Sequence, residues 1–137
     1  MASSQFVRRI ITTSEAGPVG GPYSQGVVIG HTLYLSGSIG LDPKTGKFAG
    51  EGVQEQARQS LKNLGEVLKA AGVSYKNVVK TNVFLKDMND FAAMNEVYSE
   101  FFSDRHPARS TVQVAALPRN AKVEIEAVAI LGDIQDE

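Results

Sequence analysis

The 137 residues fit one domain, 1–137, which would bury about two thirds of the surface that its unfolded chain exposes. With 14 basic and 15 acidic residues the formal net charge is −1, which provides no field to gather nucleic acid or an anionic membrane. The absence of cysteine excludes disulfides, thiolate nucleophiles and cysteine-ligated zinc, and it weakly favours a reducing compartment.

The N-terminal part predicts a strand followed by a long loop. Residues 6–13 (FVRRIITT) are rich in β-branched side chains and predict a first strand rather than a transit peptide. Residues 14–26 (SEAGPVGGPYSQG) hold four Gly and two Pro, so they predict an irregular loop that is long enough to carry function. No apolar run approaches the ~18 residues of a membrane-spanning helix, and we expect no secretory leader.

The middle of the chain predicts a hairpin and a helix. Residues 27–29 and 32–36 form the expected arms, with Gly30-His31 as the turn, and residues 41–52 form a turn-rich connector. From residue 53 apolar side chains recur every three or four positions, which predicts a helix of about five turns that stops at Gly72. Its apolar stripe comprises Val53, Ala57, Leu61, Leu64, Leu68 and Ala71.

The C-terminal half predicts a strand, a helix and two more strands. Residues 77–87 read as a strand, and Asn89-Asp90 as the N-cap of a helix that ends near Ser103. One face of that helix would carry Phe91, Met94, Tyr98 and Phe101. Strands are expected at 109–115 and 122–131. The order β, ββ, α, β, α, ββ predicts an α+β domain with two helices packed on one face of a mixed sheet.

The last predicted strand indicates self-association. Val123, Ile125, Ala127 and Ala129 alternate with Glu124, Glu126, Val128 and Ile130, and neither set is uniformly polar. Two helices can cover only one face of the sheet. We therefore expect another copy of the chain to cover the other face, with both glutamates at the rim of that interface.

Arg109 and Glu124 are the strongest candidates for chemistry. A guanidinium on a strand can grip a carboxylate with two parallel hydrogen bonds, and a partly buried glutamate can act as a general acid or base. The alternative is structural, with Arg109 simply ion-paired to Glu124 or Glu126. Tyr23 could wall a pocket or be a packed loop aromatic. His31 and His106 lack metal-ligand spacing, so a metal site is not expected.

Several segments together resemble the RidA family of reactive intermediate imine/enamine deaminases, also named YjgF. The segments are GPYSQG, LYLSGSIGLDPKTG, ARQSLKNL, VVKTNVFLKDMNDFAAMNEVY, HPARSTVQVAALP and VEIEAVA, so the resemblance spans about residues 7–131. The opening FVRRIITT resembles animal members and suggests a eukaryotic-type protein. The resemblance implies a chorismate-mutase-like fold, a homotrimer and clefts between the subunits.

The resemblance also assigns roles to individual residues. It places the carboxylate-binding arginine at Arg109 and the catalytic glutamate at Glu124. Ser38 stands where the family usually has glutamine, and Thr111 stands where many bacterial members have cysteine. The substrate-binding positions that it implies are Tyr23, Ser36, Gly37, Asn95 and Thr111.

The implied activity is hydrolysis of 2-aminoacrylate-type enamines and imines, which pyridoxal-phosphate enzymes release, to 2-oxo acids and ammonia. No metal or organic cofactor is expected. Two alternatives stay open: a single-strand-specific endoribonuclease that inhibits translation, and a non-catalytic trimer that binds small acids or acts like a chaperone. Nucleic-acid binding is disfavoured by the near-zero charge. We expect a cytoplasmic protein, with a mitochondrial or nuclear pool left open.

Overall fold

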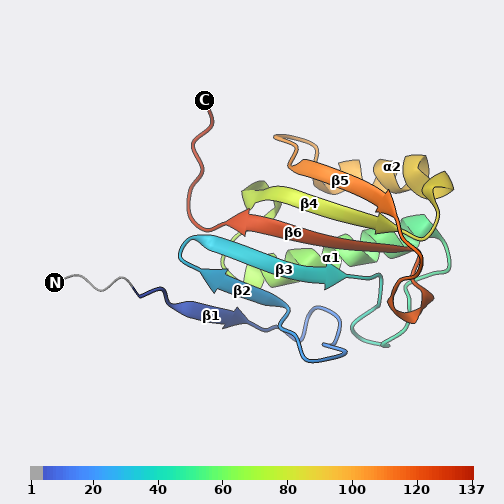
Figure 1. Ribbon diagram of the computed structural model, residues 1–137, viewed down its shortest axis with the longest axis horizontal. Helices are drawn as coiled ribbons and strands as arrows, with labels where there is room; N and C mark the ends of the chain where they lie inside the picture. The colour runs from blue at the N-terminus through green and yellow to red at the C-terminus, as the bar shows by residue number, and fades with distance from the viewer. Residues whose placement is uncertain (1–4) are drawn as a thin grey trace.

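The fold centres on one mixed sheet of six strands, described here in a computed structural model that covers residues 5–137. The strand order is β1-β2-β3-β6-β4-β5, and only the β4–β5 pair is parallel (Figure 1). The last strand therefore lies in the middle of the sheet, between β3 and β4. The strands are β1 Arg8–Ile11, β2 Gly26–Ile29, β3 Thr32–Ser38, β4 Val78–Leu85, β5 Ala108–Gln113 and β6 Val123–Ile130.

Both long helices, α1 (Val53–Ala70) and α2 (Phe91–Phe101), lie against one face of this sheet (Figure 1). The core forms between them and the strands, where Leu61 and Ile125 are fully buried. The α1 helix ends in a Schellman motif, because Val73 N–H donates to the Leu68 carbonyl and Gly72 N–H to the Lys69 carbonyl. Gly72 has φ +85°, the left-handed conformation that glycine tolerates best. The predicted α+β class and five-turn helix are confirmed.

The other face of the sheet has no helix over it and is called the open face below. Along β6, Val123, Ile125, Ala127 and Ala129 are buried, while the four alternating residues are half-buried. Apolar side chains stand exposed on this face, including Ile10 at 50% and Tyr34 at 53% exposure. Among the described residues no helix has the length and apolar character needed to cross a membrane.

Several predicted boundaries need correction. The first strand covers four residues, not 6–13, since only Arg8–Ile11 pairs with β2. The predicted N-cap position of α2 is confirmed at Asp90, but the Asp90 side chain makes no cap hydrogen bond. Asp87 caps the 3₁₀ turn Met88–Asp90 that leads into α2, because its carboxylate accepts from Asn89 N–H. That helix ends at Phe101, and Phe91 is 37% exposed, not part of a buried face.

Candidate functional site

Glu124 lies on the open face near the start of β6, beside a bulge in β3. Leu35 pairs with Ala127 and Ser38 pairs with Ile125, so β3 has one more residue than β6 over this stretch. At the bulge, Gly37 leaves the space that the carboxylate occupies. A Cβ on Gly37 would stand 2.6 Å from Glu124 Oε2. Glycine thus leaves the room that the Glu124 carboxylate takes up, because a larger residue here would force that carboxylate to shift.

The electrostatics of Glu124 suit acid–base chemistry. Burial raises the pKa of its carboxyl above the usual glutamate range, and the negative charge of Glu126 raises that pKa further. The Glu126 carboxylate accepts a hydrogen bond from Asn82 Nδ2 at 3.3 Å, whereas no hydrogen bond or ion pair to Glu124 occurs within the described protomer. Glu124 is thus a half-buried carboxyl that binds its proton more tightly than a surface glutamate does.

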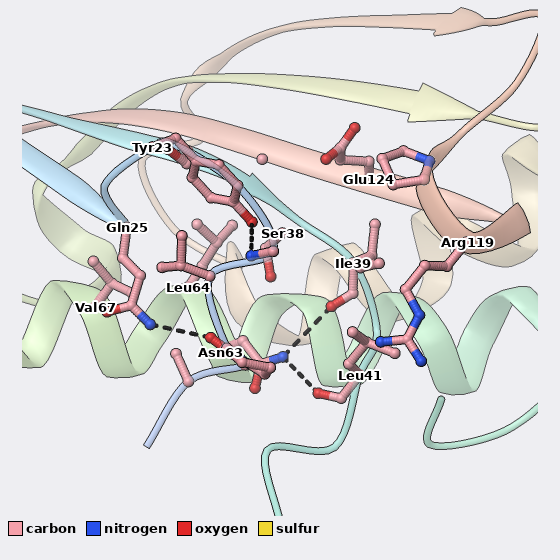
Figure 2. Close-up of a pocket in the computed structure, with 18 residues that line it drawn as sticks. Tyr23, Gln25, Ser38, Ile39, Leu41, Asn63, Leu64, Val67, Arg119 and Glu124 are labelled. Atoms are coloured by element: carbon pink, nitrogen blue, oxygen red, sulfur yellow. Dashed lines mark hydrogen bonds between the residues drawn. The ribbon is translucent and has the colours of Figure 1, made fainter. Parts of the chain in front are cut away.

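A cavity of about 530 Å³ opens beside Glu124 and runs under the loop that precedes β2. Tyr23, Ser36 and Gly37 line it together with Glu124, so the structure brings these four predicted site residues together. Figure 2 labels Tyr23 and Glu124 among the residues around this cavity. The floor is apolar and includes Leu64 and Val67 of α1. Tyr23, Ser36, Gly37 and Glu124 are called the glutamate half-site below.

Polar side chains of this cavity make hydrogen bonds that fix its walls. Gln25 Nε2 donates to the Thr13 and Gly17 carbonyls, which ties the loop to the end of β1. Ser36 Oγ donates to the Ser24 carbonyl. The Tyr23 hydroxyl accepts from Gly20 N–H at 3.2 Å, which orients the ring over the cavity (Figure 2). Ordering the loop in advance lowers the entropic cost of binding a ligand.

Ser38, where the family usually has glutamine, is tied to α1. Its Oγ donates to the Ser60 carbonyl at 2.9 Å, and Ser60 Oγ donates to the Ser38 carbonyl at 2.7 Å. The side chain also lines the cavity. Serine therefore joins β3 to α1 at this point, and the side-chain amides that line the cavity are those of Gln25 and Asn63.

Arg109 lies on the helix-covered face of β5. Its Cα partner on β4 is Thr81, which is fully buried and hydrogen-bonded to Tyr98 of α2. The Arg109 guanidinium carbon stands 4.7 Å from the Tyr98 ring centroid and 5.6 Å from that of Phe91. No carboxylate within residues 5–137 forms an ion pair with Arg109. The alternative in which Arg109 pairs with Glu124 or Glu126 is therefore wrong for the protomer.

Asn95 and Thr111 hold the two buried side-chain polar atoms that lack a partner in the described part of the chain, Asn95 Oδ1 and Thr111 Oγ1. Thr111 follows Arg109 by two residues on β5, so both side chains point to the same face. Asn95 lies one turn from both Phe91 and Tyr98 along α2, on the helix face that meets Arg109. Because buried polar atoms are nearly always paired, the two oxygens mark a place where a further group is expected. Asn95, Arg109 and Thr111 are called the arginine half-site.

The two half-sites lie on opposite faces of the sheet. Arg109 stands beside Thr81 under α2, whereas Glu124 stands beside Phe84 and Gly37 on the open face, and β4 separates β5 from β6. One protomer therefore cannot present both groups to one small molecule. A second copy, placed with its arginine half-site against the glutamate half-site of the first, can complete the constellation.

Sequence reasoning did not identify Phe91 and Tyr98 as neighbours of the Arg109 guanidinium. Their spacing on α2 indicated one apolar face, which is the ordinary reading of such residues. The signal that distinguishes them is Asn95, a polar residue on the same face between them. Within the described residues no group of three or more His, Asp or Glu side chains is arranged to hold a metal ion.

The fold and the two half-sites define an α+β protein with a ligand-sized cavity. A family model described as Endoribonuclease L-PSP matches residues 13–131. The chain belongs to this family, which is that of the RidA and YjgF proteins.

Relatives of high identity cover nearly the whole chain. A human protein named 2-iminobutanoate/2-iminopropanoate deaminase is 52% identical over 96% of this chain and 96% of its own length. An Arabidopsis thaliana protein named Reactive Intermediate Deaminase A, chloroplastic, is 48% identical over 96% of this chain and 70% of its own length.

Solved structures resemble the fold as closely. Escherichia coli TdcF with bound serine superimposes with a TM-score of 0.86 at 46% identity, covering 90% of this chain and 99% of that one. A protein described as a putative endoribonuclease from Thermotoga maritima gives a TM-score of 0.88 at 46% identity, covering 91% and 98%.

Proposed function

We propose that the protein hydrolyses 2-imino acids, and the enamines in equilibrium with them, to 2-oxo acids and ammonia. The observation that carries this proposal is Glu124, a half-buried carboxyl with a raised pKa at the end of a cavity. The names of the human and Arabidopsis relatives support the same reaction class. The serine bound to TdcF supports a cleft of amino-acid size.

The reaction has a balanced course that needs one carboxylate grip and one acid/base. Arg109 holds the substrate carboxylate through its N–H donors, and the substrate C=N carbon faces Glu124. The Glu124 carboxylate takes a proton from water as the water oxygen attacks that carbon, which forms a carbinolamine. Glu124 then passes that proton to the nitrogen. It next takes the proton of the new hydroxyl, whose oxygen becomes the 2-oxo group, and delivers it to the same nitrogen as the C–N bond breaks and ammonia leaves.

Asn95 and Thr111 complete the arginine half-site in this proposal. Asn95 Oδ1 is a hydrogen-bond acceptor without a donor, and Thr111 Oγ1 can donate or accept. The acceptor suits an N–H of the imine or a proton of the attacking water. Opposite them, Tyr23 forms the wall and Ser36 and Gly37 form the strand end behind the substrate.

The active assembly is a homotrimer in which each cleft lies between two copies. Arg109 of one copy and Glu124 of the next would meet there, and the placement of these two residues on opposite faces of one protomer supports this arrangement. The exposed apolar side chains of the open face supply the surface for association.

The first test measures ammonia release from an imino acid generated in the assay from alanine or 2-aminobutanoate by an amino-acid oxidase. Glu124→Gln keeps the shape of the side chain and removes its titration. We expect the rate to fall by about a hundredfold or more while the fold is retained. An unchanged rate in the variant would show that Glu124 has only a structural role.

Because the matching family model is described as an endoribonuclease, the same test also measures ribonuclease activity. Single-stranded RNA is supplied in a parallel assay to the wild-type protein and to Glu124→Gln. Cleavage without ammonia release would favour a ribonuclease. Binding of a 2-oxo acid with neither activity would favour a non-catalytic small-acid trimer.

A further inference from the structure

The environment of Arg109 is aromatic where an anion would be usual. Its guanidinium carbon is 4.7 Å from the Tyr98 ring centroid and 5.6 Å from the Phe91 ring centroid, and no carboxylate in the described chain pairs with it. Ring faces attract a cation electrostatically through their quadrupole without acting as a counter-anion. The rings thus hold the Arg109 guanidinium in place, and a ligand can supply the carboxylate that binds a guanidinium strongly.

The Tyr98 ring is fixed at its far end. Its hydroxyl and Thr81 Oγ1 lie 2.7 Å apart in a buried hydrogen bond, and the tyrosine is only 7% exposed. Thr81 is the Cα partner of Arg109 on the neighbouring strand. Arg109 of β5 therefore lies against the Tyr98 ring of α2, and the Tyr98 hydroxyl bonds to Thr81 of β4, the strand beside β5. These linked contacts restrict the long arginine side chain to a small region.

Phe91 has no comparable structural reason for its position. It is the first residue of α2 and is 37% exposed, so it contributes little to the core. Its ring nevertheless comes within cation–π range of Arg109. Phe91 and Tyr98 together are called the aromatic seat of Arg109.

We propose that Phe91 and Tyr98 are positioning residues that hold the Arg109 guanidinium in the orientation that receives the substrate carboxylate. This inference rests on the proposed function for the identity of the ligand. It predicts that loss of one ring weakens binding of every ligand that presents a carboxylate, whereas the acid–base step at Glu124 is affected less.

The experiment compares Phe91→Leu with Phe91→Tyr and with Phe6→Leu. Phe91→Tyr restores a ring, and Phe6→Leu is a matched change of an exposed phenylalanine (77% exposed) away from both half-sites. Three quantities are measured: KM and kcat for ammonia release, the Kd of 2-oxobutanoate, and the ¹H–¹⁵N signal of Arg109 Nε, which nearby rings shift.

We expect Phe91→Leu to raise KM and the Kd of 2-oxobutanoate by about three- to thirtyfold. The fall in kcat should be smaller than the rise in KM, the Arg109 Nε signal should move, and Tm should stay near wild type. Phe91→Tyr should restore KM and Kd, and Phe6→Leu should change neither. Unchanged KM and Kd in Phe91→Leu, or equal changes in Phe6→Leu, overturn the inference.

The two proposals fail in different ways. If the wild-type protein releases no ammonia but binds 2-oxobutanoate, and Phe91→Leu weakens that binding, the proposed function is wrong and the aromatic seat stands. If ammonia release is normal in both proteins, the seat is wrong and the function stands. A wild-type protein that binds no 2-oxo acid overturns the seat whatever its ammonia release.

Discussion

At the scale of single residues, Glu124 and Arg109 are both ionisable groups that form no ion pair within residues 5–137. Burial and the charge of Glu126 raise the pKa of the Glu124 carboxyl, and the Arg109 guanidinium lies against the Phe91 and Tyr98 rings. Such arrangements cost stability and are typical of functional sites, where charge is kept ready for a ligand.

The raised pKa of Glu124 predicts a pH-dependent stability cost. The folded state binds this proton more tightly than the unfolded chain, so the contribution of Glu124 to stability falls as pH rises from the usual glutamate range through the raised value. Glu124→Gln should therefore unfold at a higher temperature than wild type at neutral pH, and the difference should shrink below pH ~4. Thermal unfolding of both proteins across pH 3–8 checks this, and a destabilised variant at pH 7 would contradict it.

Arg109→Lys separates the guanidinium fork from its charge. A lysine keeps the charge but is a mobile point donor, so one well-placed charge-assisted hydrogen bond is lost, at about 1.5–3 kcal/mol. By the transition-state relation kcat/KM should fall about tenfold to 150-fold. Tm measured on the same variant is the control. Near-normal kcat/KM together with a lowered Tm would assign Arg109 a structural role.

At the scale of elements, the bulge in β3 is the device that makes room for Glu124. Without the extra residue, β3 would continue in register with β6, and the Gly37 position would not face the carboxylate as it does. The 3₁₀ turn before α2 likewise positions a side chain. Capped by Asp87, it sets where α2 begins and hence where Phe91 stands relative to Arg109.

Gly37→Ala tests the bulge. The new Cβ would meet Glu124 Oε2 at 2.6 Å, and a carboxylate at the end of a flexible side chain can move away. We therefore expect the fold and Tm to be largely kept, while kcat for ammonia release falls at least tenfold because a small misplacement of an acid/base is costly. A variant with wild-type kcat would show that Glu124 can act from a different position.

At the scale of the whole molecule, two features of the protomer favour association with a second copy. One is the open face, and the other is the placement of the two half-sites on opposite faces of the sheet. The buried set of β6 faces the helices, and the half-buried set points to the open face. Figure 1 shows both helices on the other side of the sheet. The same face carries Glu124, so in the proposed trimer the surface that drives association would also complete the site.

Subunit complementation tests this arrangement. Arg109→Ala and Glu124→Gln are each expected to be inactive alone. When the two are co-expressed, about one quarter of the clefts in randomly mixed trimers should combine an intact Arg109 with an intact Glu124 from different copies. Ammonia release should then recover to about that fraction of wild type. No recovery in mixed trimers of verified mass would contradict a shared cleft.

The sequence by itself determined the features that depend on neighbouring residues. Spacings of two to four residues predicted the five-turn length of α1, its end at Gly72 and the alternation of β6, and the structure confirms all three. Six segments spread over about residues 7–131 together indicated the family by resemblance. Only the tertiary structure decided that Arg109 and Glu124 lie on opposite faces, and that the half-exposed Phe91 ring lies 5.6 Å from the Arg109 guanidinium carbon. The physical reason is that alternation shows which residues of one strand share a face, whereas the face that two different strands share depends on pairing and register between distant segments.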